Sequence, residues 1–366
     1  MTVNEIFLEN YRNHKSTHAK FSDGVNVIHG RNGQGKTNLL EAVYYLAAGR
    51  SFRATSDKEL ISFDSDRAAI RANIVSAGRE QTLEAKFARG RRRELLANGV
   101  KLKKSIDLAG RLAVVLFIPD DLDMIKSGAS VRRKLMDHGL SQLRPGYLAA
   151  LTEFNRLYDH KTRILRDNNP SMLTLLDDFD QAMAEQSARL IYYRAAYSDA
   201  LSQRAAKNHS EFSGGVETLS IRYKTVGGID AFGKKPSELL PELLEHQRAH
   251  RQAELRAGLC LSGAHKDDLE IEIDGMSARK FASQGQARTA AVSIKLAERD
   301  IHFEDRGEDP IFLLDDVLSE LDTQRQDFIL SRILRGQVMV TCCDETQAVR
   351  DYADTILRVD DGVVLT

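Results

Sequence analysis

The chain has 366 residues with 52 basic and 53 acidic side chains, so its overall charge does not favour nucleic acid or an anionic membrane surface. Hydrophobic residues make up 42%, which supports a sizeable core, and no apolar run reaches the roughly 18 residues needed to span a bilayer. The first ten residues lack the basic and apolar regions of a signal peptide. We therefore expect a soluble, cytoplasmic protein. Cys260, Cys342 and Cys343 lack the spacing of a zinc site or disulfide framework, so we expect reduced core thiols.

Short apolar segments at the start of the chain predict strands over residues 3–8 and 16–21. A third short apolar run, formed by Val25, Val27 and Ile28, is typical of a buried strand. We expect these three strands to form an antiparallel group before the first helix.

A complete phosphate-binding motif follows the third strand. The residues GRNGQGKT match G-x-x-x-x-G-K-[ST] at every fixed position, and the alternative interpretation is a glycine-rich turn. The glycines allow successive backbone N–H groups to face one concavity at the positive end of the next helix. Lys36 would reach the β- and γ-phosphates of a nucleotide, and the Thr37 hydroxyl would bind Mg²⁺. The predicted nucleotide-binding residues are Gly30, Arg31, Asn32, Gly33, Gln34, Gly35, Lys36, Thr37 and Asn38.

Residues 68–102 again have the pattern of strands, and the pair Asn98-Gly99 is typical of a tight hairpin turn. Between Lys86 and Lys104 the hairpin carries eight basic residues against one acid, Glu94. Such a run is usually a solvated face, and the alternative is a nucleic-acid contact. One more short strand is predicted over residues 114–119.

The pattern becomes helical after Asp120. Apolar spacing predicts long helices over residues 131–168 and 175–205, and a further helix from Pro236 to about Gly258. These helices are too short for an extended coiled-coil arm.

We interpret the helical region, residues 126–257, as an insertion. It would interrupt an α/β domain made of residues 1–125 and 258–366.

A second anion site is indicated after the insertion. Ser283, Gly285 and Gln286 stand at the start of a helix, where polar residues and glycine favour an anion. The alternative is an ordinary helix N-cap.

An apolar strand, residues 311–314, runs into Asp315 and Asp316. A P-loop enzyme needs an acid at the end of a neighbouring buried strand for its Mg²⁺ shell, and Asp315 fits that role. Asp316 is then placed to orient or deprotonate the attacking water. The alternative is that both acids cap the next helix. Another buried strand ends in Thr341, and an Asp-Gly turn predicts a final hairpin.

This order of motifs resembles the ABC ATPase heads of the SMC and DNA-repair branch, and within it the RecF family over essentially the whole chain. The matching segments are NYRNH at 10–14, GRNGQGKTNLLEAVYYLAAGRSFR at 30–53, DKELI at 57–61, SVRRKLMD at 130–137, GAHKDDLEI at 263–271, ASQGQARTAA at 282–291 and LLDDVLSELD at 313–322. The resemblance implies an ABC-type P-loop ATPase head, with a mixed sheet, an antiparallel β-subdomain and a mostly helical inserted lobe.

The resemblance also implies a mechanism. In such heads the signature segment of one subunit closes over ATP held by the P-loop of another, so Ser283, Gly285 and Gln286 would act in trans and ATP would assemble a homodimer. The resemblance further implies binding to double-stranded DNA and to junctions of single and double strands. It implies work with RecR and RecO to load RecA at gaps, in recombinational repair and the SOS response at the nucleoid. Arg12 and Asn13 match a family segment near the nucleotide.

Three positions depart from the family pattern. ABC heads usually place glutamate after the magnesium-binding aspartate, whereas this chain has Asp316, so we expect a weak, DNA-stimulated ATPase that acts as a switch. The switch position usually holds histidine, and Thr341 is the candidate here. The catalytic candidates are therefore Lys36, Asp316 and Thr341. The family's G-P-H reads GAH at 263–265, which leaves the role of the histidine open, and we assign no Q-loop glutamine.

Two other classes compete with a DNA-dependent switch. The ATPase subunit of a membrane transporter would be expected to carry a signature closer to LSGGQ, a switch histidine and a shorter insertion. A P-loop kinase would need an acceptor pocket and a lid, and the separation of about 280 residues between Lys36 and Asp315 argues against that compact fold. No N-K-x-D motif supports a GTPase.

Overall fold

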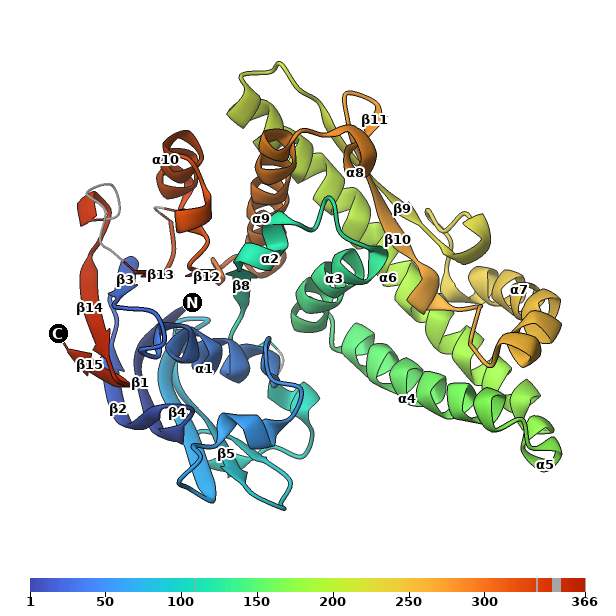
Figure 1. The fold of residues 1–366 in the computed structure, drawn as a ribbon, viewed down its shortest axis with the longest axis horizontal. Helices are drawn as coiled ribbons and strands as arrows, with labels where there is room; N and C mark the ends of the chain where they lie inside the picture. The colour runs from blue at the N-terminus through green and yellow to red at the C-terminus, as the bar shows by residue number, and fades with distance from the viewer. Residues whose placement is uncertain (109, 334, 344–349, 366) are drawn as a thin grey trace. The chain divides into compact units, whose positions relative to one another are not determined.

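The computed structural model describes residues 1–366 except 109, 334, 344–349 and 366 (Figure 1). The chain forms two compact units. The first unit contains Met1–Asp123 and Lys295–Thr366, and the second contains Met124–Ile294. Within the described part of the chain, no helix is both long and apolar enough to cross a bilayer.

The first unit is built on two six-stranded sheets, of which one is mostly parallel. Its strands are β3 (Val25–His29), β8 (Val114–Phe117), β12 (Ile311–Asp315), β13 (Val338–Cys342), β14 (Thr355–Asp360) and β15 (Val363–Leu365). They lie in the order β15-β14-β3-β13-β12-β8. All pairs are parallel except β14 with β15, which form the predicted hairpin. Every residue of β12 and β13 is buried, as expected for central strands of a parallel sheet.

The other sheet is antiparallel. Its strands are β1 (Thr2–Tyr11), β2 (His14–Lys20), β4 (Arg67–Ser76), β5 (Arg79–Ala88), β6 (Glu94–Ala97) and β7 (Val100–Lys101), in the order β2-β1-β4-β5-β6-β7. Ala97 pairs with Val100, so Asn98 and Gly99 form the predicted tight turn, both at positive φ.

Helix α1 (Lys36–Ala48) packs against strands of both sheets and buries ten of its thirteen residues. Apolar side chains of α1 and of both sheets share one core. The helix ends at Gly49, whose left-handed backbone allows its N–H to bond the carbonyl of Tyr45.

The prediction that β3 joins an antiparallel group with β1 and β2 is wrong. β3 instead lies between β13 and β14 and runs parallel to both. The physical reason is that α1 follows β3, and a strand followed by a crossover helix belongs to a parallel sheet. Val25, Asn26, Val27 and Ile28 are all buried, so β3 is covered on both faces.

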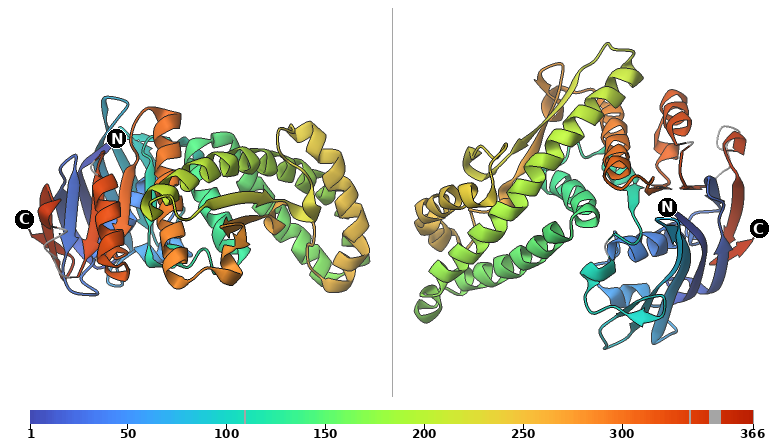
Figure 2. Two further views of the ribbon diagram at one scale, coloured as in Figure 1. Left: turned by 90° about the horizontal axis from the view of Figure 1, so that it is seen from above. Right: turned by 180° about the vertical axis from the view of Figure 1, so that it is seen from behind.

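The second unit is mostly helical, with a three-stranded antiparallel sheet. Its helices are α3 (Ala129–Leu143), α4 (Pro145–Asp167), α5 (Pro170–Leu173), α6 (Leu176–Ser213), α7 (Pro236–Ala257) and α8 (Ala278–Phe281), and its strands are β9 (Leu219–Lys224), β10 (Asp268–Ile273) and β11 (Met276–Ser277). Helices α4 and α6 lie along each other (Figure 2). Three further α-helices lie in the described parts of the chain: α2 (Pro119–Leu122) and α10 (Thr323–Arg332) in the first unit, and α9 (Gln284–Arg306), which begins in the second unit and ends in the first.

The predicted insertion, residues 126–257, lies wholly within the second unit, which also takes in residues 124–125 and 258–294. The extension follows from strand pairing, because β10 pairs along its whole length with β9 of the insertion. The predicted domain boundary at 257/258 therefore stays a prediction about sequence segments. The boundary between the two compact units of the structure lies at 294/295.

Three helices of the second unit are tied together by a buried ammonium group. Nζ of Lys161, on α4, lies 2.6 Å from Asp180 Oδ1 on α6 and 2.6 Å from Glu254 Oε2 on α7. The Lys161 and Glu254 side chains are fully buried. Burial lowers the pKa of Lys161, but the two carboxylates outweigh that effect and raise it. Such a cluster is stable only when it is complete, because a lone buried charge is costly.

Replacing Lys161 with methionine should destabilise the second unit. Asp180 would keep Arg251, 2.5 Å away, but Glu254 would lose its cation. We expect the free energy of unfolding to fall by about 3–5 kcal/mol, measured by urea denaturation followed by circular dichroism. The control is Lys134→Met at an exposed position on α3, expected to change stability by less than about 0.5 kcal/mol. Equal decreases in the free energy of unfolding of the two variants would contradict the stabilising role assigned to Lys161.

Candidate nucleotide-binding and hydrolysis site

The phosphate-binding loop, residues 30–37, connects β3 to α1 and follows a path that requires glycine at two positions. Gly30 has φ 151°, and a Cβ there would lie 2.3 Å from the carbonyl oxygen of Val359. Gly35 has φ 114°, and a Cβ there would lie 2.8 Å from Asn13 Oδ1. Both are fixed glycines of the motif, so local geometry accounts for them.

The Lys36 ammonium lies over this loop. Its Nζ donates to the carbonyl oxygens of Gly30 at 2.5 Å and Arg31 at 3.1 Å. A nucleotide phosphate would replace these carbonyls as the partner of the ammonium. Cys343 Sγ is 3.8 Å from the same Nζ and donates to Asn32 Oδ1 at 2.8 Å. The expectation of a core thiol is therefore wrong for Cys343, which is half-buried beside the loop.

The carboxyl ends of β3, β13 and β12 bring together residues that are far apart in the sequence. Thr37 Oγ1 donates to Asp315 Oδ1 at 2.8 Å, and Thr341 Oγ1 donates to the same oxygen at 2.8 Å. Burial raises the pKa of Asp315, while the two hydroxyl hydrogen bonds act in the opposite direction. Ligand sites in open α/β sheets lie at this edge.

Asp316 follows in an unusual backbone conformation, with φ 55°. Its N–H donates to Thr341 Oγ1 at 2.8 Å, and its carbonyl accepts a hydrogen bond from Ser319 Oγ at 2.7 Å. The Asp316 residue is partly exposed to solvent. That is the requirement for the predicted role of orienting a water molecule.

The motif implies ATP and Mg²⁺, and the residues present suit both. Mg²⁺ prefers hard oxygen ligands and usually takes one or two carboxylates together with phosphates and water. The Thr37 hydroxyl and the Asp315 carboxylate, 2.8 Å apart, supply such oxygens. Among the described residues, no group of three or more His, Cys, Asp and Glu could hold a metal by itself. A bound ion would neutralise charge on the phosphates.

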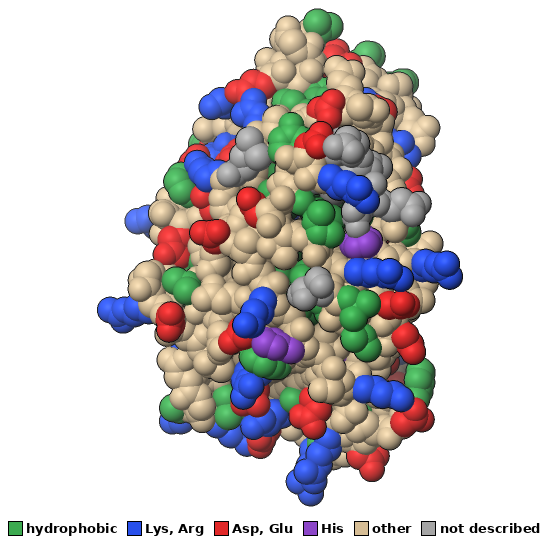
Figure 3. Space-filling view, turned by 90° about the vertical axis from the view of Figure 1, so that its left-hand side faces the viewer, with side chains coloured by type: hydrophobic (Ala, Val, Ile, Leu, Met, Phe, Trp, Pro, Cys, Tyr) green, Lys and Arg blue, Asp and Glu red, His purple; other side chains and the backbone are tan. Residues whose placement is uncertain are grey.

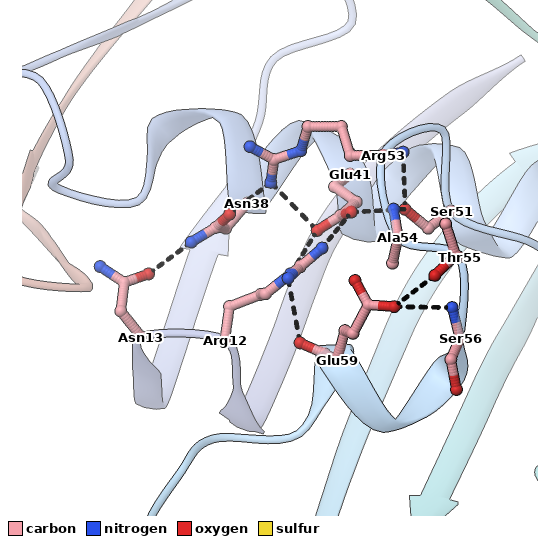
Figure 4. Close-up of polar contacts among 10 residues, drawn as sticks. All are labelled: Arg12, Asn13, Asn38, Glu41, Ser51, Arg53, Ala54, Thr55, Ser56 and Glu59. Carbon is pink, nitrogen blue, oxygen red and sulfur yellow. Dashed lines mark hydrogen bonds and ion pairs between the residues drawn. The ribbon is translucent and has the colours of Figure 1, made fainter.

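Of Arg12 and Asn13, both predicted to lie near the nucleotide, Asn13 contacts the loop and the first turn of α1, and Arg12 contacts the second turn. Asn13 Nδ2 donates to the Gln34 carbonyl at 2.9 Å, and Asn38 Nδ2 donates to Asn13 Oδ1 at 2.7 Å. Arg12 binds Glu41 with two hydrogen bonds of 2.9 and 2.8 Å (Figure 4). Asn13 therefore supports the loop directly, whereas Arg12 bonds helix α1 through Glu41.

Glu41 is a central residue of this network that the sequence analysis missed. Its fully buried carboxylate also accepts hydrogen bonds from Ser51 at 2.5 Å and Arg53 at 3.2 Å (Figure 4). Arg53 reaches Asn38 Oδ1 as well, at 2.5 Å. The available signal was an acid within the apolar run NLLEAVYYL, since a buried acid requires a partner.

The signature segment, residues 283–286, caps helix α9. Ser283 Oγ accepts from the Gln286 N–H at 3.2 Å, and Gln286 Oε1 accepts from the Ser283 N–H at 2.8 Å, which is a capping box. Gln286 Nε2 also donates to Glu217 at 2.9 Å. The alternative of an N-cap thus describes the geometry, while Ser283 remains exposed. Ser283, Gly285 and Gln286 belong to the second unit, whereas the loop, Asp315, Asp316 and Thr341 belong to the first.

The basic hairpin is less charged in space than in sequence. Arg93 pairs with Asp57 at 3.0 Å and lies over the Tyr45 ring, and Lys101 pairs with Glu94. Lys86 also lies near Glu84 on its own strand, and Arg89 lies near Asp66. Acids outside residues 86–104 therefore fold against the hairpin and reduce its charge. On another face of the protein, basic and acidic side chains are likewise interspersed (Figure 3).

Arg91 and Arg92 at the hairpin tip differ from their neighbours. Both are exposed, and neither has an ion-pair partner among the described residues. They are exposed side chains able to meet an external anion.

The fold and the site define an ABC-type P-loop ATPase head with a helical lobe. The family model described as RecF/RecN/SMC N terminal domain matches residues 2–362. A protein of Acetivibrio thermocellus named DNA replication and repair protein RecF is 36% identical over 366 residues, 99% of each chain. Its namesake in Listeria monocytogenes is 38% identical over 337 residues, 91% of this chain and 90% of the relative. The chain belongs to the RecF family.

Solved structures agree with this assignment. The recombination mediator protein RecF with ATPrS in the RecFOR pathway is similar with a TM-score of 0.92 and 33% identity, over 99% of this chain and 97% of the other. RecF with ATP gives a TM-score of 0.89 at 33% identity, over 99% and 96% of the two chains. An SMC head bound to ScpA, at 16% identity and a TM-score of 0.55 over 100% and 96% of the chains, shares the fold alone.

Replacing Glu41 with glutamine should weaken the first unit in a pH-dependent way. Burial raises the pKa of Glu41, but hydrogen bonds from Arg12 and Ser51 and the nearby arginine charges outweigh it and lower the pKa below its ordinary 4.5. The charged form therefore stabilises the fold above pH 4.5, and this contribution is lost as the pH falls through the lower folded-state pKa.

We expect Glu41→Gln to lower the free energy of unfolding by about 2–4 kcal/mol at pH 7. The difference in free energy of unfolding between the variant and the wild-type protein should narrow below pH 4.5. Urea denaturation across a pH series measures this difference. Glu80→Gln at an exposed position on β5 is the control and should leave stability nearly unchanged. A difference in free energy of unfolding that stays constant with pH would show that the charge of Glu41 is not the cause of the lost stability.

Proposed function

We propose that the protein is an ATP-dependent DNA-binding switch of recombinational repair. The observation that carries the proposal is the meeting of Thr37, Asp315 and Thr341 beside the phosphate-binding loop. Family membership over 99% of the chain supports it, as do the solved relatives that hold ATP or ATPrS. ATP binds at residues 30–38, and Thr37 and Asp315 hold Mg²⁺.

The site hydrolyses ATP slowly. Lys36 exchanges its loop carbonyls for phosphate oxygens, and the partly exposed Asp316 orients the water. The Asp316 carboxylate is one methylene shorter than the glutamate usual in ABC heads, so its reach toward a water is shorter. A slow reaction leaves time for a nucleotide-bound state to act.

ATP also joins two copies of the chain. Ser283, Gly285 and Gln286 of one copy close over the nucleotide held by the other. The exposure of Ser283 at the start of α9 supports this role, because the helix N-terminus favours an anion. Each nucleotide is then held between two subunits.

The switch binds double-stranded DNA and junctions of single and double strands, with RecR and RecO as partners that help load RecA at gaps. The proposal extends to the SOS response and to a place at the nucleoid. Support comes from relatives named for DNA replication and repair and from the RecFOR pathway named for the solved relatives. Similarity over 99% of the chain to these proteins favours this function over a transporter subunit.

Replacing Asp316 with asparagine should separate ATP binding from hydrolysis. The amide keeps the shape of the side chain but cannot accept the proton of water, so we expect hydrolysis to fall at least about 100-fold. ATP affinity and ATP-dependent dimerisation, followed by light scattering, should persist. Asp327→Asn, exposed on α10, is the control. A protein that stays monomeric at saturating ATP, with and without DNA, would refute the composite site.

Charge reversal at Arg91 and Arg92 should weaken DNA binding in a salt-dependent way. Each neutralised phosphate contributes about 0.9 to the slope of log affinity against log salt, so the double change should reduce that slope by about 2. Fluorescence anisotropy with duplex DNA at several salt concentrations measures it.

The control for this experiment reverses Arg163 and Arg166, which are exposed on α4 in the second unit. It produces the same change in net charge. If the control reduces the slope and the hairpin variant does not, the DNA surface lies on the helical unit. Arg93 is left unchanged because it pairs with Asp57.

A further inference from the structure

The hydroxyl group of Thr341 contacts both acids of the site at once. Its Oγ1 donates to Asp315 Oδ1 at 2.8 Å and accepts from the Asp316 backbone N–H at 2.8 Å. A hydroxyl has one proton to donate, so this proton is committed to Asp315. Thr341 is 1% exposed. These contacts differ from the predicted switch role, in which the residue would help to place the attacking water.

The strand register explains why Thr341 occupies this position. On β13, Thr341 is paired on one side with Asp315 of β12 and on the other with Ile28 of β3. It therefore stands between the strand that carries the magnesium-binding acid and the strand that enters the phosphate-binding loop. A valine of nearly the same shape would fill this position but make neither hydrogen bond.

Asp316 needs support at this point because its backbone is left-handed, with φ 55°. That conformation is unfavourable for a residue with a Cβ. The N–H of Asp316 bonds to Thr341, and Ser319 bonds the Asp316 carbonyl. The direction of the Asp316 side chain follows from this backbone turn.

We propose that Thr341 is a positioning residue whose hydroxyl fixes the Asp315 carboxylate and the Asp316 turn relative to each other. Binding of Mg²⁺ and orientation of water are then coupled through one side chain. The inference rests on the proposed ATPase function. It assigns Thr341 no direct contact with nucleotide or water.

The test compares Thr341→Val, which removes the hydroxyl, with Thr341→Ser, which keeps it. The first readout is the affinity for a fluorescent ATP analogue in Mg²⁺ and again in EDTA. The second is the hydrolysis rate, separated into kcat and KM. Loss of a group that orients a metal ligand typically costs about 10–100-fold. We expect the gain in affinity from Mg²⁺ and kcat each to fall by that factor in the valine variant, and the serine variant to stay within about threefold.

Thr162→Val is the matched control for a lost buried hydroxyl. Thr162 lies on α4 in the second unit, and its Oγ1 contacts Cys260 Sγ at 3.4 Å. It should lower the melting temperature without changing the Mg²⁺ gain or kcat. Thr341→Ala provides the same comparison if valine prevents folding.

Two outcomes overturn different claims. If Thr341→Val loses thermal stability but keeps the wild-type Mg²⁺ gain and kcat, Thr341 is structural only and the inference fails. If the wild-type protein binds the analogue but hydrolyses no ATP, the proposed ATPase function is refuted. The increase in analogue affinity caused by Mg²⁺ then still decides the role of Thr341.

Discussion

The hydrogen bond between Thr37 and Asp315 joins residues 278 positions apart, and the rest of the site depends on the arrangement that allows it. It requires β3 and β12 to end at one edge of a parallel sheet, with β13 between them. The same arrangement brings Thr341 to Asp315. A helix that packs against both sheets then begins at Lys36, directly after the loop. The chemistry of this site is thus a consequence of strand order.

Buried charges hold the surrounding structure in place. In the first unit, Glu41 connects α1 with Arg12 from the turn after β1 and with the segment that follows the helix. In the second unit, Lys161 connects three helices. Such groups contribute little when complete but are costly to break, so they favour one packing over others. We regard them as determinants of geometry rather than sources of large stability.

The surface charge of the protein is local. The whole chain is nearly neutral, and four of the eight basic residues of the hairpin pair with acids. Arg91 and Arg92 remain exposed and form no ion pair among the described residues. Ion pairs partly neutralise a patch that looks strongly basic in the sequence. The length of a basic run therefore overstates the electrostatic field at the folded surface.

The sequence by itself determined the phosphate-binding loop, the two acids after a buried strand, most helices and the family, because each depends on neighbouring residues. Only the tertiary structure decided that β3 joins a parallel sheet, that residues 258–294 pack with the helical unit, and that Cys343 lies beside Lys36. The partners of Glu41, Thr341 and Arg93 were also beyond the sequence. Each of these contacts joins segments distant in the chain, and local patterns carry no information about which strands will lie side by side.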